Sequence, residues 1–477
     1  MDLNLAGLLP LLRERAEFRS VCDQLNQAAR GHRQDARLNM SGLAAPVRPY
    51  FLATLQSFLG RPLLVLTARP VQARELARNT AAYSSQPDLV LSWPTPDTLP
   101  YERIEQDPAI TGGRLETLAA LGNLDPVQSA QLVIFASAKG LMQPTLSKAD
   151  FRRHIVTLKR GQFLDLNELL GSFIQLGYSP ESLVEQPGQF SRRGGIVDFF
   201  PLTSEMPIRL ELFGDEIDSL RYFDPVTQRS SQRTEQITLT PPVEVPLWRS
   251  GEAYERLAEV DRSGLREEVR EEWDRLLSRV ENGEQFEGIE QFMPYYTGGE
   301  DMCSLLDHLP AETIVILDGP AQINFAVEEL TLQAEDLRAE FEKNGEIPEG
   351  VIRPYLNWKE LEAGFSHYPR LLLNRTDEQE DKLGEAPVVT AAQVLSDENL
   401  EVDLFGPVSE FAGQIPRVIQ TVDTFLKEGQ RIVVVTQQAE RLREQFEDHD
   451  IFPVLRKEGG GGKLSTLPGA EIGRAHV

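Results

Sequence analysis

The segment from Gly42 to Pro49 has part of the spacing of a loop that binds nucleotide phosphates. Such a loop follows the pattern G-x-x-x-x-G-K-[ST], because its backbone N–H groups and lysine hold the phosphates while the hydroxyl holds magnesium. Here Val47 stands at the second glycine, Arg48 at the lysine and Pro49 at the hydroxyl. Pro46 and Pro49 also lack a backbone N–H donor. We therefore expect an ordinary turn into a helix, without a bound nucleotide.

A later carboxylate supports the same interpretation. The apolar run 313–317 ends at Asp318, which is followed by Gly and Pro. A helicase-type acidic motif would instead continue with Glu, so that one carboxylate binds magnesium and the other positions water. We interpret Gly42, Arg48 and Asp318 as a degenerate nucleotide site without function.

No other segment offers a catalytic or metal site. The glycine-rich segment 457–464 lacks both the first glycine and the final hydroxyl of the phosphate loop, and a flexible loop is the better interpretation. Asp215, Glu216 and Asp218 have no His at ligand spacing and are typical of a solvated hairpin turn. We therefore predict no catalytic residue, no metal and no cofactor in this chain.

Arginines beside a glycine turn could instead recognise a protein. Arg192 and Arg193 precede Gly194 and Gly195, and a turn there would hold both side chains outward. The planar guanidinium pairs with carboxylates through two hydrogen bonds, so two such groups on an acidic surface would suit an acidic partner. Phe190 could supply an aromatic anchor. The alternative is that both arginines are merely solvated, as surface arginines usually are.

Composition excludes several classes of protein. The 477 residues include 74 Asp and Glu against 48 Lys and Arg, a formal net charge of −26, which disfavours DNA binding over a broad surface. The two cysteines are far apart, as in a protein of a reducing compartment. No secretory leader and no run of about 18 apolar residues is present, so we expect a cytoplasmic protein without membrane contact.

Alternating apolar runs and amphipathic segments predict the architecture. In the first part of the chain, strands separated by helices indicate parallel β-α units, and closely spaced strands follow in a hairpin-rich α+β region. Strands are predicted at 63–67, 89–93, 132–137, 183–185, 195–200, 208–213, 219–223, 313–317, 371–373, 388–390 and 432–436. Helices are predicted at 49–59, 71–83, 110–121, 164–176, 252–282, 321–343, 415–428 and 438–447.

The most informative stretch begins at Phe190 with Phe-Ser-Arg-Arg-Gly-Gly-Ile-Val-Asp-Phe-Phe-Pro, and Pro-Ile-Arg-Leu-Glu-Leu-Phe-Gly-Asp-Glu-Ile-Asp-Ser-Leu-Arg-Tyr-Phe-Asp follows up to Asp224. It resembles a module shared by the excision-repair protein UvrB and the transcription-repair coupling factors (the Mfd family), in which this module docks UvrA. The degenerate phosphate loop favours the coupling factors, because a UvrB would carry an intact loop. The same resemblance extends to the stretches 41–66, 95–121, 285–310 and 425–440.

The resemblance implies an α/β fold: a degenerate RecA/UvrB-like parallel-sheet domain with an inserted α+β UvrA-docking domain, followed by a second small α/β domain. The expected divisions are a UvrB-like subdomain at 1–140, the UvrA-interaction domain at 141–238 and the second half of the UvrB-like module at 239–343. A small domain of unknown role is expected at 351–470, and a tail at 471–477 matches a translated sequencing adapter. Arg193 best matches the family's docking arginine, and Arg192 matches less closely. Ser179 stands where relatives often place a further arginine.

The function implied by the resemblance is transcription-coupled nucleotide excision repair. This region would recruit UvrA by protein contact, whereas the full-length protein would be an ATP-dependent DNA translocase that displaces stalled RNA polymerase. ATP, magnesium, RNA polymerase and double-stranded DNA would be bound by downstream domains absent from this chain. The alternative is a UvrB-like excision-repair paralogue that binds damaged DNA.

Overall fold

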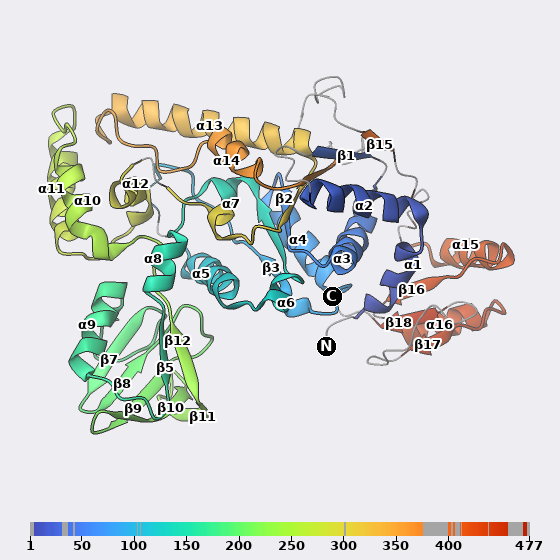
Figure 1. Cartoon of the computed structure of the whole chain (residues 1–477), viewed down its shortest axis with the longest axis horizontal. Coiled ribbons are helices and arrows are strands. Elements are labelled where there is room, and N and C mark those ends of the chain that lie inside the picture. The colour runs from blue at the N-terminus through green and yellow to red at the C-terminus, as the bar shows by residue number, and fades with distance from the viewer. Residues whose placement is uncertain are drawn as a thin grey trace.

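The computed structural model describes residues 4–30, 37–41, 43–102, 104, 106–299, 302–374, 399–401, 404–405, 411, 413–436, 438–456 and 471–474. Over these residues the chain forms a large body, an inserted domain and a small C-terminal unit (Figure 1).

The body is built on a seven-stranded sheet within the described residues, and its neighbouring strands are parallel. In spatial order the strands are β15 (Asn399–Glu401), β1 (Arg37–Ser41), β14 (Arg370–Leu373), β13 (Ile314–Asp318), β2 (Leu63–Thr67), β4 (Val133–Ser137) and β3 (Val90–Ser92). Every residue of β2 and β4 is buried, as expected of apolar strands that are covered on both faces.

Helices cover both faces of this sheet. Leu63 and Val65 of β2 pack into one hydrophobic cluster, whereas Leu64 and Leu66 pack into another, because successive strand residues point to opposite faces. The first cluster includes residues of α2 (Ala16–Arg30), α3 (Arg48–Leu59) and α4 (Pro70–Ala81). The second includes residues of α5 (Pro108–Asn123), α7 (Ala138–Met142), α10 (Ser250–Ala258), α11 (Glu267–Glu281), α12 (Met293–Thr297), α13 (Pro320–Lys343) and α14 (Trp358–Phe365). The result is the predicted α/β architecture.

The short elements α1 (Leu9–Arg13), α6 (Pro126–Ser129) and α8 (Lys148–Arg153) complete the body, with 3-10 turns at Ala6–Leu8, Ala45–Val47, Pro87–Leu89, Leu247–Arg249, Ile289–Phe292 and Leu305–His308. No helix of the described residues is long and apolar enough to cross a membrane.

The chain leaves the body after α8 and forms the inserted domain, drawn in green at the lower left of Figure 1. Its six-stranded sheet runs, in spatial order, β11 (Ser230–Thr234), β10 (Glu216–Phe223), β9 (Ile208–Phe213), β8 (Ile196–Phe199), β7 (Gln189–Arg193) and β6 (Ser179–Pro180) over the described residues. Within the described residues, neighbouring strands of this sheet are antiparallel, except that β6 and β7 are parallel. The chain enters the inserted domain through β5 (Val156–Lys159) and leaves it through β12 (Gln236–Leu239), and these two strands pair in a two-stranded sheet. Helix α9 (Leu166–Leu176) packs on one face of the larger sheet through Phe173.

A three-stranded parallel sheet forms the C-terminal unit in the described residues, with β18 (Glu471–Arg474) between β16 (Val433–Thr436) and β17 (Val454–Arg456). Helices α15 (Ile415–Lys427) and α16 (Ala439–Glu447) belong to the same unit.

Three local predictions differ from the structure. The apolar run 371–373, predicted in the small domain, is β14 inside the seven-stranded sheet, because a short apolar run does not specify its sheet partner. The single helix predicted over 252–282 is α10 and α11, separated by a turn in which the Asp261 carboxylate accepts the Ser263 N–H. Residues 183–185 form no strand. The strand predicted at 388–390 lies outside the described residues.

Candidate partner-binding surface

The degenerate nucleotide site keeps the strand-turn-helix order of a phosphate loop but holds an ion pair. Arg48 is the first residue of α3, and its Nη1 donates to an Oδ1 of Asp318, the last residue of β13. The Arg48 Nε and Nη2 both donate to the Leu43 carbonyl at 3.1 Å. The Arg48 side chain is 2 % exposed and that of Asp318 is 1 % exposed. The two positions that would bind phosphate and magnesium in an intact site therefore neutralise each other.

The surroundings agree with this assignment. The predicted turn into a helix is present, since Ala45–Val47 form a 3-10 turn that leads directly into α3. Pro46 and Pro49 lie in the first turns, where an intact loop would present N–H donors. Gly42 lies outside the described residues. Within the described part of the chain, no group of three or more His, Cys, Asp or Glu side chains could hold a metal ion.

The β7–β8 hairpin carries the predicted docking residues. Arg193 pairs with Ile196, so Gly194 and Gly195 form a two-residue turn between the strands. Gly194 has a φ of 64°, in the left-handed region that glycine adopts without a steric cost. A residue with a side chain would be strained there, which explains why this turn needs glycine.

Arg192 and Arg193 lie on opposite faces of the sheet, so the predicted joint positive spot is wrong. Arg192 pairs with Val197, a residue of the core under α9, and its Nε donates to the Gly194 carbonyl at 3.2 Å. Arg193 pairs with Ile196, whose side chain points to the other face. Turn geometry alone did not show this, because adjacent residues of a strand alternate between faces. We call the face of Arg193, opposite α9, the outer face.

The prediction of Phe190 as an exposed anchor is also wrong. Its side chain is 5 % exposed and belongs to the core of the inserted domain. The ring stacks on Phe173 of α9, with centroids 5.0 Å apart and an interplanar angle of 11°. Phe190 alternates with Ser191 along β7 and therefore points inward, where it supports the hairpin without reaching a partner.

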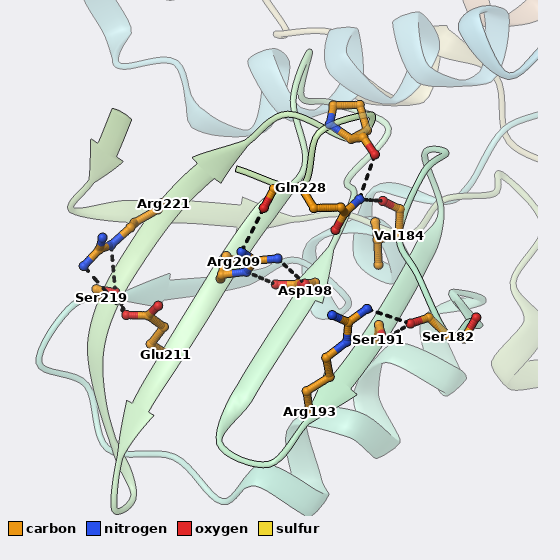
Figure 2. Close-up of polar contacts among 11 residues, drawn as sticks. Ser182, Val184, Ser191, Arg193, Asp198, Arg209, Glu211, Ser219, Arg221 and Gln228 are labelled. Atoms are coloured by element: carbon orange, nitrogen blue, oxygen red, sulfur yellow. Dashed lines mark hydrogen bonds and ion pairs between the residues drawn. The ribbon is translucent and has the colours of Figure 1, made fainter. Parts of the chain in front are cut away.

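Charged side chains on the outer face mostly pair with one another (Figure 2). The Nε and Nη2 of Arg209 donate to the two Asp198 oxygens at 2.8 Å each, and this hydrogen bonding raises the pKa of Arg209. The Arg209 guanidinium also lies 4.7 Å from the centre of the Phe223 ring. Glu211 accepts a hydrogen bond from the Ser219 hydroxyl at 2.8 Å and lies 3.7 Å from the Nη2 of Arg221. Arg209 and Arg221 are therefore compensated, whereas the exposed Arg233, in register with Arg221 on β11, forms no ion pair within the described residues.

Arg193 differs from these two arginines. Its Nη2 donates to the backbone carbonyl of Ser182 at 3.1 Å, and the Ser191 hydroxyl donates to the same carbonyl at 3.2 Å (Figure 2). Within the described residues, Arg193 forms no ion pair, and its side chain is exposed. The guanidinium is thus oriented by one carbonyl while its positive charge stays uncompensated.

The alternation of residue types along β9 also indicates, from the sequence alone, which other residues lie on the outer face. In the run Arg-Leu-Glu-Leu-Phe from Arg209 to Phe213, period-two alternation places Arg209, Glu211 and Phe213 on one side. Asp215 and Glu216 lie at the predicted hairpin turn, where Gly214 has a φ of 65°.

Comparison with known proteins identifies the inserted domain first. Residues 156–244 match the family model of the UvrB interaction domain. These residues begin at β5 and end just after β12, so the match coincides with the inserted domain. The inserted domain, set into an α/β body, is therefore similar to the UvrB interaction domain.

Curated relatives then specify the kind of protein. The chain is 26% identical to the transcription-repair-coupling factor of Staphylococcus aureus over 348 residues, which is 69% of this chain and 28% of that protein. It is 28% identical over 318 residues to that of Escherichia coli (65% and 26%), and 24% identical over 349 residues to that of Bacillus subtilis (70% and 28%). These matches confirm the predicted resemblance to the N-terminal portion of a coupling factor. The chain spans little more than a quarter of the length of these relatives.

Proposed function

We propose that this chain recruits UvrA in transcription-coupled nucleotide excision repair, and that Arg193 on the outer face makes a central contact. The observation that carries the proposal is the uncompensated guanidinium of Arg193, which the Ser182 carbonyl orients on the outer face, where Arg209 and Arg221 are paired within the described residues. A carboxylate of UvrA could form two parallel hydrogen bonds with this guanidinium. The match to the UvrB interaction domain and the names of the relatives support the choice of partner and pathway.

The remaining activities of the pathway are assigned elsewhere. We propose that ATP hydrolysis with magnesium, contact with RNA polymerase and translocation on double-stranded DNA belong to the part of the relatives' length that this chain does not span. The buried Arg48–Asp318 pair supports a chain without its own nucleotide chemistry. A cytoplasmic location follows from the same proposal, because the pathway acts on the bacterial chromosome.

The test compares two adjacent arginines that lie on opposite faces. Affinity of the purified chain for UvrA is measured by titration, and complex formation by co-elution on a sizing column. Removal of a hot-spot arginine costs about 2 kcal/mol or more, so Arg193→Ala should weaken binding about 30-fold. Arg192→Ala removes the same charge from the other face and should change the affinity by less than about threefold.

The titration distinguishes an error in the proposed site from an error in the proposed partner. Equal affinity of Arg193→Ala and the wild type would refute the site but not the partner. No detectable complex between UvrA and the folded wild-type chain would refute the proposed function itself.

A further inference from the structure

Two phenylalanines of the inserted domain are exposed without a structural role. Phe213 is 81 % exposed and Phe163 is 73 % exposed. Neither belongs to a hydrophobic cluster of the described residues, and neither ring stacks on another aromatic ring there. Isolated exposed apolar residues are common on proteins, so exposure alone decides nothing. The position of these two rings is more informative.

Both rings flank one carboxylate. Phe213 pairs with Glu216 across the β9–β10 hairpin, and Phe163 forms a β-bridge with the same Glu216. Side chains of directly paired residues lie on the same face, with Cβ atoms about 5 Å apart. Phe163, Glu216 and Phe213 therefore form one row across three neighbouring segments, which we call the aromatic row. Within the described residues, Glu216 forms no ion pair.

The aromatic row lies on the outer face. The neighbouring pair in the hairpin, Ile217 with Leu212, points into the core under α9, so Phe213 and Glu216 point the opposite way. Phe213 also follows Glu211 by two residues on β9, and Glu211 stands in register with Ile196. Since Ile196 is in turn paired with Arg193, the outer face is continuous from Arg193 to Phe213.

The distance between the two sites fits one interface. Two strand spacings of about 4.8 Å and one two-residue step of about 7 Å place the Cα atoms of Arg193 and Phe213 about 12 Å apart. A standard protein interface covers about 800 Å² per partner and is easily wider than this. Aromatic side chains and arginine are the residue types enriched in interface hot spots.

We propose that Phe213, with Phe163 beside it, is a second anchor of the UvrA-binding surface. This inference rests on the proposed function and adds the chemistry of the partner's surface. UvrA presents a carboxylate to Arg193 and, about 12 Å away, an apolar pocket for Phe213 with a basic group that faces Glu216. The charges of Arg193 and Glu216 have opposite signs, so they also determine the orientation in which the partner docks.

The experiment measures the affinity of the whole chain for UvrA by titration, with thermal unfolding of each variant as a check of folding. Phe213→Ala should weaken binding at least 10-fold without a change in the melting temperature, since the exposed ring supports no core. Phe163→Ala should weaken binding less. Val226, 88 % exposed after the opposite end of β10, supplies the matched control, and Val226→Ala should leave the affinity within about twofold.

A charge reversal tests the second part of the inference. Glu216→Lys should weaken binding more than 10-fold, because it places a cation against the partner's basic group. If Arg193→Ala weakens binding while Phe213→Ala and Glu216→Lys bind like the wild type, the second anchor is refuted and the proposed function stands. If the folded wild-type chain does not bind UvrA, both are refuted.

Discussion

Removal of the Asp318 carboxylate tests whether the degenerate nucleotide site is now a structural element. Asp318→Ala removes the carboxylate that Asp318 supplies to the buried Arg48 guanidinium, while the two bonds to the Leu43 carbonyl remain. Breaking a buried pair from one side costs about 3–5 kcal/mol. For a domain of more than 250 residues, each kcal/mol lowers the melting temperature by about 2 °C, so the body should melt about 6–10 °C lower.

The assay is thermal unfolding by calorimetry, in which the transition of the body is followed separately from that of the inserted domain. Glu252→Ala is the control, because it breaks only the exposed i,i+4 pair with Arg256 and should cost less than about 1 kcal/mol. The double variant Arg48→Met/Asp318→Leu should regain most of the stability lost in Asp318→Ala, since apolar side chains can replace a buried pair at little cost.

Two results would refute this reasoning. If Asp318→Ala melted like the wild type, the pair would contribute nothing to the stability of the body. If the wild type bound ATP in a titration and Asp318→Ala did not, the segment from Gly42 to Pro49 would be a working nucleotide site, and its interpretation as degenerate would be wrong.

Two further predictions concern Phe190 in the inserted domain and His308 in the body. Phe190→Ala removes a ring stacked on Phe173 and should lower the free energy of unfolding of the inserted domain by about 3–5 kcal/mol. Phe213→Ala removes an exposed ring and should change this free energy by less than about 0.5 kcal/mol. Equal effects of the two variants in calorimetry would contradict the core position of Phe190. The Nε2 of His308 donates to the Leu146 carbonyl at 2.8 Å, and burial lowers the pKa of this side chain. The folded chain therefore binds fewer protons than the unfolded chain, and the free energy of unfolding should fall as the pH drops below about 6.5. His308→Gln should reduce this dependence between pH 7.5 and 5.5 in urea unfolding, and an unchanged slope would exclude His308 as its origin.

Much of the local structure could be predicted from the sequence. The strands β2, β4, β9 and β13 and the helices α3 and α13 occur within a few residues of their predicted positions, because their apolar residues repeat with the period of one secondary structure. The departures of the segment 42–49 from the phosphate-loop pattern could also be read from the sequence, since each missing group is a single residue at a defined spacing. The run that contains Arg193 was sufficient to predict a module shared with UvrB, and the match of residues 156–244 to the UvrB interaction domain agrees with that prediction.

Contacts between distant segments were decided only by the tertiary structure. Arg48 and Asp318 are 270 residues apart, and no local pattern shows that both side chains meet at the same edge of a parallel sheet. The sheet that β14 joins, the core position of Phe190 and the shared row of Phe163 and Phe213 depend in the same way on strand register. The sequence determined which segments are strands and which residue types they carry. Register then decided which faces those residues share, because a shift by one residue moves every side chain of a strand to the opposite face.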